Sequence, residues 1–356
     1  MRLLVLGGTK LLGSAVVRAA LDAGWHVTTL TRGLHGAPPP GVDARTGDRT
    51  TPAGLAALGD DEWDVCIDTS GYVPRDVRLS ARTLAGRVGR YVFVSTVNVY
   101  PDWPERPVTS SSPVSDCPPD AGPDDGDYGY LKSGCERAVL ESFPDATTIN
   151  RAGLIFGPRD NIARVSWWVQ RVAAGGEVLA PGRPDQPLAL IDARDMAEWM
   201  LGAPPGAFVV NSAAGTQTFG SLLATARDVT GSDARFTWAD DQVLLDASVE
   251  PWTELPLWLP ESMSGHAWDL DVSGAYATGL RIRPLAESMS GHAWDLDVSG
   301  AYATGLRIRP LAESLADVWE WVREHGLPSP EDAERPTELE KRMSREREQK
   351  ILTGLA

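Results

Sequence analysis

The N-terminus of the chain joins a short apolar run to an apolar, helix-like stretch through a glycine turn. Arg2–Leu6 ends at Gly7 and Gly8, and the stretch Leu11–Ala23, rich in Leu, Ala and Val, ends at Gly24. A strand that turns through glycine into a helix leaves the free N–H groups of the first helical turn beside the end of the strand. The chain is therefore constrained to begin with a strand–helix unit, and this turn favours the binding of a pyrophosphate.

Three glycines have separate roles in such a turn. Gly7 permits the tight turn, Gly8 lets the backbone approach a phosphate, and Gly13 allows the helix to pack closely on the sheet. Lys10 stands where a further glycine is usual, so the spacing departs from the common dinucleotide fingerprint. An ordinary strand-to-helix turn is the alternative interpretation. The residues expected at the nucleotide are Gly7, Gly8, Thr9, Lys10, Leu11, Leu12 and Gly13.

The first half of the chain alternates strand-like and helix-like segments. The candidate strands are Arg2–Leu6, His26–Thr31, Asp64–Asp68, Tyr91–Ser95 and Thr147–Arg151, and the candidate helices are Leu11–Ala23, Arg75–Leu84 and Tyr128–Ser142. This alternation predicts an α/β fold, with a parallel sheet that helices cover on both faces. Ligands bind at the carboxyl ends of the strands in such sheets, where Gly7, Arg32, Ser70 and Ser95 fall.

Tyr128 and Lys132 form a second motif at the start of the third candidate helix. Residues four apart lie on the same face of a helix, one turn from each other. A free tyrosine has a pKa of about 10, and a neighbouring ammonium lowers it by favouring the phenolate. The pair therefore predicts proton exchange with a hydroxyl or carbonyl oxygen, and a nucleotide site beside it would hold a hydride carrier. Together the two motifs indicate an oxidoreductase, with a plain surface helix pair as the alternative.

Composition limits the classes of protein to which the chain can belong. Its 356 residues are 42% hydrophobic and 23% charged, which is ordinary for a soluble globular protein of two lobes. The three cysteines have neither a paired framework nor metal-ligand spacing, so a reducing cytoplasm and no metal site are expected. The N-terminal apolar run is too short for a signal peptide, and no segment approaches the uncharged length of a membrane span. The formal net charge of −16 opposes nucleic-acid binding and favours a small-molecule substrate.

A long segment rich in Pro, Ser and Asp, Pro101–Asp127, leads directly into Tyr128. Long loops within compact domains are usually functional or disordered, so this segment is interpreted as a flap over the substrate. Asp124, Asp125 and Asp127 could contact a cationic substrate, and a solvated acidic loop is the alternative.

The last third of the chain contains an identical tandem duplicate, in which residues 261–286 recur unchanged as 287–312. Two copies do not make a solenoid, which needs about three stacked repeats. Identity without drift indicates a recent duplication or an artefact. We expect one copy to complete the smaller lobe and the surplus residues to loop out.

These motifs resemble the extended short-chain dehydrogenase/reductase family, in its epimerase/dehydratase branch with the modified motif Gly-Gly-Thr-x-x-x-Gly. The resemblance runs from Met1 to about Trp321. It implies a Rossmann-type doubly wound parallel sheet for NAD(P), a smaller C-terminal α+β substrate lobe and a possible homodimer through two Rossmann helices. The expected division is 1–160 with 185–212 for the nucleotide domain, 161–184 with 213–327 for the substrate lobe, and 328–356 for a charged tail.

The resemblance also assigns catalytic roles. The family's Tyr-x-x-x-Lys falls on Tyr128 and Lys132, and its catalytic Ser/Thr falls on Thr96. Tyr128 would be the general acid/base, Lys132 would lower its pKa and bind the ribose, and Thr96 would hydrogen-bond the reacting oxygen. Ser95 would then face the nicotinamide. A plain strand-end residue is the alternative for Thr96.

Cofactor choice depends on the end of the second strand, where Thr31-Arg32-Gly33 offers no acid. An acid there selects NAD through the ribose 2′-hydroxyl, whereas an arginine suits a 2′-phosphate, so NADP(H) is preferred to NAD(H). A solvent-facing arginine is the alternative for Arg32. By resemblance, further nucleotide contacts are expected at Asp48, Arg49, Thr69, Ser70, Gly71, Gly153 and Leu154.

The substrate argument is mostly negative. Family members that act on nucleotide sugars commonly carry an Asn where this chain has Leu154 and an Arg near Leu188. These differences remove donors that a pyrophosphate needs, so the substrate is not expected to be a sugar nucleotide, although Arg164, Arg171 and Arg183 could compensate. The residues expected at the substrate are Thr96, Tyr72, Trp167 and Trp168, with buried packing as the alternative for the two tryptophans.

The leading hypothesis is an NADP(H)-dependent oxidoreductase that interconverts a carbonyl and a hydroxyl on a small metabolite, in secondary metabolism. A redox-neutral epimerase or dehydratase with a retained cofactor would carry the same triad. A non-catalytic NADP-binding protein, similar to stem-loop RNA-binding relatives, is the alternative from another class.

Overall fold

The computed structural model describes residues 1–34, 36, 38–281, 311–333 and 335–355. They fall into two compact units. Unit 1 holds Met1–Ile155, Ala193–Asn211 and Asp269–Arg281; unit 2 holds Phe156–Asp192, Ser212–Trp268 and the described residues from Leu311 onward. The chain was expected to return to unit 1 over 185–212, but the segment that returns is the shorter Ala193–Asn211. A second segment, Asp269–Arg281, also belongs to unit 1.

Unit 1 is built on one sheet of seven strands. These are β1 (Arg2–Leu6), β2 (His26–Thr31), β3 (Val42–Thr46), β4 (Trp63–Asp68), β5 (Val88–Thr96), β6 (Thr147–Ala152) and β11 (Gly206–Val210). Every neighbouring pair is parallel, in the order β11-β6-β5-β4-β1-β2-β3, so the strand order reverses between β1 and β4. This doubly wound arrangement confirms the predicted parallel sheet and puts the ligand-binding crevice at the carboxyl ends of β1 and β4.

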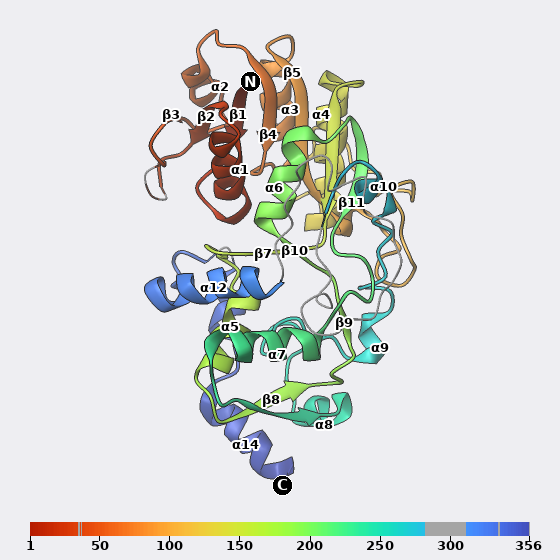
Figure 1. The fold of residues 1–356 in the computed structure, drawn as a ribbon. Helices are drawn as coiled ribbons and strands as arrows, with labels where there is room; N and C mark the ends of the chain where they lie inside the picture. The colour runs from red at the N-terminus through yellow and green to blue at the C-terminus, as the bar shows by residue number, and fades with distance from the viewer. Residues whose placement is uncertain (35, 37, 282–310, 334, 356) are drawn as a thin grey trace. The chain divides into compact units, whose positions relative to one another are not determined.

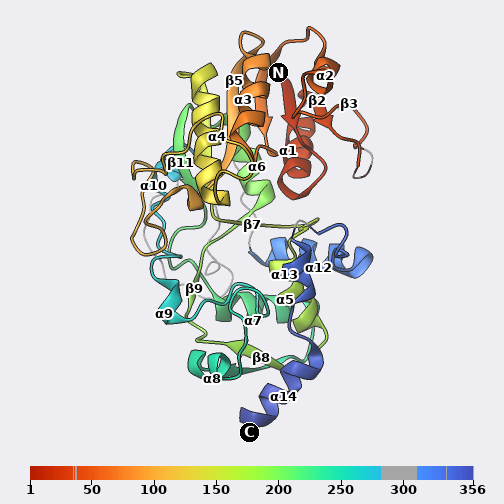
Figure 2. The same ribbon diagram turned by 180° about the vertical axis from the view of Figure 1, so that it is seen from behind.

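Helices cover both faces of this sheet, because its central strands are apolar on both sides (Figure 1). The helices α1 (Leu11–Asp22) and α6 (Ala193–Gly202) pack side by side on one face. Seen from behind, α3 (Pro74–Leu84) and α4 (Tyr128–Ser142) cover the other (Figure 2). Short elements complete the unit: α2 (Pro52–Leu55), η1 (Ala56–Leu58), η2 (Val97–Val99), the start of β7 (Leu154–Phe156) and α10 (Ser273–Ala277).

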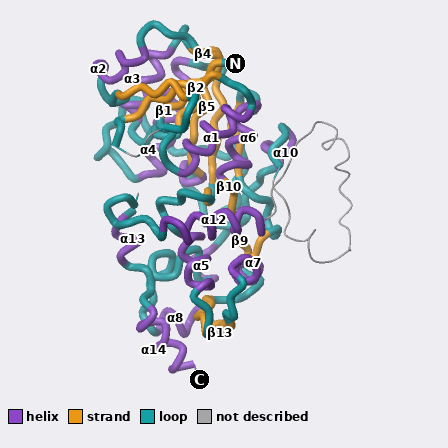
Figure 3. Tube along the Cα trace, turned by 60° about the vertical axis from the view of Figure 1, so that its left-hand side comes forward, coloured by secondary structure: helices purple, strands orange, loops and turns teal. Residues whose placement is uncertain are grey.

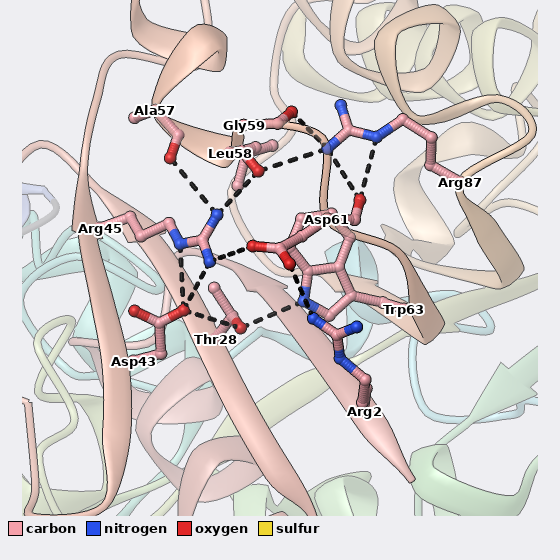
Figure 4. Close-up of polar contacts among 10 residues, drawn as sticks. All are labelled: Arg2, Thr28, Asp43, Arg45, Ala57, Leu58, Gly59, Asp61, Trp63 and Arg87. Carbon is pink, nitrogen blue, oxygen red and sulfur yellow. Dashed lines mark hydrogen bonds and ion pairs between the residues drawn. The ribbon is translucent and has the colours of Figure 1, made fainter.

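A network of polar contacts links β3 to the segment that follows η1 and contains Asp61 (Figure 4). Arg45 in β3 donates to the Asp61 carboxylate, and its guanidinium lies 5.8 Å from the ring centre of Trp63. Arg87 lies 5.5 Å from the same ring and donates to the carbonyl of Asp61 at 3.0 Å. The Trp63 indole donates to Thr28 of β2 at 3.1 Å. The edge strand β3 is thereby tied to its neighbours through side chains as well as through its ladder.

Unit 2 consists of helices and short paired strands (Figure 3). Its helices are α5 (Arg164–Ala173), α7 (Phe219–Thr230), α8 (Asp241–Asp246), α9 (Glu261–Ser264), α12 (Leu311–His325), α13 (Pro336–Glu340) and α14 (Arg345–Leu355). Its strands include the parallel pair β8 (Glu177–Pro181) and β13 (Arg235–Ala239), the antiparallel pair β9 (Pro187–Leu188) and β12 (Gln217–Thr218), and β10 (Leu190–Asp192).

The expected charged tail 328–356 is joined to unit 2 by a buried ion pair. Glu348 of α14 accepts from Arg171 of α5 at 2.7 Å, and both side chains are buried. The same carboxylate accepts from the amide of Leu179 at 3.0 Å. The helix α14 therefore buries one face of a largely polar sequence, on which the paired carboxylate of Glu348 lies one turn before the apolar side chain of Leu352.

The first copy of the duplicate contributes to both units. Residues 261–268 belong to unit 2, whereas Asp269–Arg281 belong to unit 1, where the amide of Asp271 donates to the carbonyl of Val108 at 3.3 Å. The expectation that one copy completes the smaller lobe is corrected here, because the buried side chains of Leu270 and Leu280 pack in unit 1. In the second copy, residues 287–310 lie outside the described residues.

None of the helices in the described ranges combines the length and the apolar run that crossing a membrane requires.

Deletion of residues 287–312 should leave a folded protein that still binds nucleotide. It gives the same sequence as deletion of 261–286, because the two copies are identical. Shortening the connection to α12 should change the free energy of unfolding by less than about 1 kcal/mol. Chemical denaturation and nucleotide titration test this, and loss of cooperative unfolding would show that both copies are needed.

Candidate active site

The turn after β1 approaches the end of β4 closely. Gly7 and Gly8 have φ values of 111° and 112°, a region that favours glycine. A Cβ on Gly7 would lie 2.5 Å from the Thr69 hydroxyl oxygen, and one on Gly13 would lie 2.6 Å from the amide nitrogen of Gly8. The three glycines therefore let the turn, the start of α1 and the end of β4 pack together, as the sequence predicts.

The start of α1 fits a phosphate group. Lys10 is the N-cap residue in extended backbone and makes no side-chain capping hydrogen bond. The first-turn amides of Leu11, Leu12 and Gly13 are thus available to an anion at the positive end of the helix dipole. A Cβ on Gly13 would collide with the Gly8 backbone in this turn, whereas one on Gly8 would press against the side chains of Thr29 and Val17. The chain's own residues are therefore suited to hold the pyrophosphate of a dinucleotide.

Two charged residues lie at the ends of β2 and β3, where a dinucleotide ribose would be expected. Arg32 is exposed. Hydrogen bonds from Thr50 lower the pKa of Asp48, and the charge of Arg32 lowers it further. Arg32 therefore presents a cation at the strand end, with the Asp48 carboxylate in its neighbourhood.

Arg49 has its side chain inside unit 1. Its guanidinium donates to Asp68 and Ser80, and to Ser70 at 3.4 Å. Burial opposes the charge, but the Asp68 carboxylate raises the pKa of Arg49 above its ordinary value. This guanidinium is engaged in a buried ion pair, so the expected adenine contact would need the backbone or Asp48.

Lys132 is buried in α4, and its ammonium faces the ends of β4 and β5. Nζ donates to the carbonyl of Gly71 at 2.7 Å and to that of Val94 at 2.5 Å. It also lies 4.2 Å from the ring centre of Phe93 and 5.5 Å from that of Tyr72. Burial lowers the pKa of Lys132, and the two carbonyls hold its protonated form in place.

Tyr128 is the first residue of α4, and the residue is 41% exposed. Asp127 caps the helix by accepting from the amide of Tyr130 at 2.9 Å. The ring centre of Tyr128 lies 6.4 Å from that of Tyr72, which is 46% exposed. Tyr128, Tyr72 and Lys132 therefore form one cluster, with two rings open to solvent and one buried cation.

Thr96 ends β5 and is hydrogen-bonded to Asn98. Its hydroxyl donates to Oδ1 of Asn98 at 2.9 Å and accepts from the amide of Asn98 at 3.2 Å. A Cβ on Gly129 would lie 2.1 Å from the carbonyl oxygen of Asn98, so η2 presses against the first turn of α4. The helix η2, which directly follows Thr96, thus contacts the first turn of α4, which begins at Tyr128, at a position where only glycine fits.

Ser95 points into the interior. Its hydroxyl donates to Oε1 of Glu136 at 2.6 Å, and Glu136 pairs with Arg151 at 2.8 Å. Ser95 was predicted to face the nicotinamide. Its hydroxyl instead forms a hydrogen bond that links β5 to α4, because the buried carboxylate of Glu136 needs donors.

The remaining expected cofactor residues follow the ends of β4 and β6. The Thr69 hydroxyl donates to the carbonyl of Leu6 at 3.3 Å, as does that of Ser70 at 3.0 Å. Gly71 and Gly153 are tightly enclosed: a Cβ on Gly153 would lie 1.9 Å from the side-chain nitrogen Nδ2 of Asn211. Leu154, at the start of β7, is half-buried.

The two tryptophans lie in unit 2. Trp168 is fully buried, donates from its indole to the carbonyl of Pro256 at 2.7 Å and packs edge-on against Phe219. Its expected substrate contact is corrected to core packing, because every face of the ring is covered. Trp167 is half-buried and touches Trp168 edge-on.

Sequence reasoning missed Asn98, Glu136 and Arg151. For Glu136 a signal was available, since Tyr128, Lys132 and Glu136 are spaced at four-residue intervals along one helix face. For Arg151 no local signal exists, because its partners Glu136, Tyr100 and Ser110 come from other segments.

Comparison with known proteins finds a family match and relatives. The model of the NAD dependent epimerase/dehydratase family matches residues 3–203. The 2′-dehydrokanamycin reductase of Streptomyces kanamyceticus is 30% identical over 184 residues, which are 49% of this chain and 50% of that protein. The chain therefore aligns with about half the length of this relative.

Solved structures share the fold at low sequence identity. The Bordetella bronchiseptica enzyme WbmH in complex with NAD+ is 17% identical, with a TM-score of 0.61 over 92% of this chain and 99% of that one. WbmG of the same organism, in complex with NAD and UDP, is 18% identical, with a TM-score of 0.59 over 92% and 96% of the two chains. The Thermus thermophilus UDP-glucose 4-epimerase complex with NAD is 17% identical, with a TM-score of 0.59 over 91% and 100%.

Gly13→Ala should weaken binding of NADPH by at least about ten-fold, since its methyl group would displace the Gly8 backbone from the phosphate cradle. Gly202→Ala is the matched control, because a Cβ there would meet nothing within 4 Å. Titration of NADPH fluorescence measures both. Equal affinities for NADPH in the two variants would contradict a phosphate-binding site at the glycine turn and the start of α1.

Proposed function

Because the chain belongs to the NAD dependent epimerase/dehydratase family, we propose that it is an NADP(H)-dependent oxidoreductase of a small metabolite that is not a sugar nucleotide. It interconverts a carbonyl and a hydroxyl group. The cluster of Tyr128, Tyr72 and Lys132 carries this proposal, since it combines exposed phenol rings with a buried ammonium at the carboxyl ends of the strands.

The chemistry divides between the cofactor and the chain. When bound, the reduced nicotinamide supplies a hydride to the carbonyl carbon. Tyr128 donates its hydroxyl proton to the carbonyl oxygen as negative charge develops there, and the Lys132 ammonium stabilises the phenolate that remains. Thr96 holds the same oxygen, and its hydroxyl exchanges the Asn98 acceptor for the substrate. The carbon is reduced, the cofactor is oxidised and Tyr128 regains a proton from solvent.

The substrate class follows from charge and from the reductase relative. The chain carries a net charge of −16, and Asp124, Asp125 and Asp127 precede Tyr128. An acidic approach to the site favours a cationic substrate. The name of the Streptomyces kanamyceticus relative supports a ketone of an aminoglycoside as the type of molecule. We therefore assign an amino-sugar ketone, in secondary metabolism, as the substrate class.

The first experiment determines which nucleotide purifies with the protein and whether it exchanges. Readily exchanged NADPH, with oxidation of NADPH on addition of 2′-dehydrokanamycin, would support the reductase. A tightly retained oxidised nucleotide would instead support a redox-neutral epimerase or dehydratase.

Tyr128→Phe should lower kcat by about a hundred-fold or more while leaving the affinity for NADPH unchanged, because it removes the proton donor alone. Tyr130→Phe is the matched control on the same helix, where the hydroxyl donates to the carbonyl of Asp116 at 3.4 Å. Steady-state NADPH oxidation measures both variants. A Tyr128→Phe protein as active as the control would exclude Tyr128 as the acid.

Arg32→Glu should reverse the preference for NADPH over NADH by about ten-fold or more, because the cation that pairs with the 2′-phosphate becomes an anion. Arg18→Glu makes the same charge change at an exposed position of α1 and controls for it. Dissociation constants for both nucleotides are compared. If Arg32→Glu still prefers NADPH, Arg32 does not bind the 2′-phosphate.

A further inference from the structure

Unit 1 contains a second ion pair that the proposed chemistry does not use. Glu136 of α4 and Arg151 of β6 pair at 2.8 Å, and the exposed fractions of their side chains are 3% and 8%. Nε of Arg151 adds a hydrogen bond to the same carboxylate at 3.1 Å. This two-point contact fixes both the distance and the orientation between helix and strand.

The carboxylate side of the pair reaches the strand that carries Thr96. Glu136 accepts from the Ser95 hydroxyl at 2.6 Å, and Ser95 immediately precedes Thr96. Glu136 also lies one helical turn after Lys132 and two turns after Tyr128. The carboxylate is therefore the link between the end of β5 and the face of α4 that carries the proposed catalytic pair.

The guanidinium side reaches the loop that precedes Tyr128. Nη1 of Arg151 donates to the Tyr100 hydroxyl and to the carbonyl of Ser110, at 3.0 Å in each case. The guanidinium also lies 5.1 Å from the ring centre of Tyr100. Tyr100 follows η2, and Ser110 lies within the segment 101–127. Arg151 therefore holds one point of this loop in unit 1.

Stability alone does not account for such a pair. Removing two charges from water is costly, and apolar residues of similar volume often stabilise a core equally well. What the pair supplies is geometry, because a planar guanidinium and a carboxylate satisfy each other in only a few orientations. Here that geometry joins α4 and β6 to the end of β5, through Ser95, and to the loop 101–127, through Ser110.

We propose that Glu136 and Arg151 are positioning residues of the proposed reaction, which hold the end of β5, the loop 101–127 and α4 in register. In that register the hydroxyls of Thr96 and Tyr128 meet a single substrate oxygen. The inference rests on the proposed function for its catalytic consequence, but the coupling between the pair and the loop is a property of unit 1 itself.

Three variants of the full chain test the proposal. Glu136→Gln/Arg151→Met removes both charges together, so no single buried charge remains. Tyr100→Phe removes only an acceptor of Arg151, and Ser95→Ala removes only a donor to Glu136. The matched control is Glu348→Gln/Arg171→Met, which removes an equally buried pair of unit 2.

Two readouts are compared with the parent protein. Hydrogen exchange of peptides within 101–127 requires no substrate, and NADPH oxidation with 2′-dehydrokanamycin gives kcat and KM. In the double variant of unit 1, loop exchange should rise by about ten-fold or more, and kcat should fall by about a hundred-fold. The affinity for NADPH should stay within about three-fold, because Lys132 and the glycine turn keep their partners.

The single variants separate the two arms of the network. Tyr100→Phe should increase loop exchange, whereas Ser95→Ala should lower kcat and leave loop exchange unchanged. The unit 2 control should lower the melting temperature without changing either readout in unit 1.

Unchanged loop exchange and kcat in the folded double variant would overturn the proposal, as would the same changes in the unit 2 control. If the double variant does not fold, Tyr100→Phe and Ser95→Ala decide, and parental behaviour in both would overturn it. If the parent protein reduces no ketone, only the proposed function is contradicted. Hydrogen exchange of the loop still measures the coupling between the Glu136–Arg151 pair and the loop, because it requires no substrate.

Discussion

The buried carboxylate of Asp68 is the constraint on which unit 1 depends. It ends β4, is fully buried, and accepts from the Arg49 guanidinium after β3 and from the Tyr91 hydroxyl of β5 at 2.8 Å. The amide of Ser70 donates to it at 3.0 Å. An uncompensated charge at this depth would cost several kcal/mol, so these segments must converge on it. The end of β4 is thereby tied to the residues that follow β3 and, through Tyr91, to the adjacent strand β5.

The positions of the catalytic candidates follow from that alignment. Lys132 takes its two acceptors from the backbone, one after β4 and one within β5, so its ammonium is placed only when those strands are in register. The helix η2, which directly follows Thr96, contacts α4 closely at Gly129, the residue after Tyr128. A site built on backbone carbonyls and glycine contacts is rigid, because neither depends on the rotamer of an exposed side chain. Such rigidity suits an acid–base pair that must address one oxygen.

Aromatic packing and ion pairs between distant segments hold unit 2 together. Trp168 is surrounded by other side chains, including Phe219, and its indole proton is used by a backbone carbonyl. Glu348 joins the C-terminal helix to α5 through Arg171.

The sequence by itself determined the family, the parallel sheet and the elements with strong local patterns. The strand Arg2–Leu6 and the helix Tyr128–Ser142 lie where predicted, because apolar periodicity and glycine placement act within a few residues. Strand β3 was not recognised from its pattern, since its edge position leaves it largely exposed and polar. Only the tertiary structure decided that Arg49 pairs with Asp68, that Ser95 serves Glu136, and that Asp269–Arg281 joins unit 1. The partner of a buried polar group comes from whichever distant segment the fold brings to it, and no local pattern records that choice.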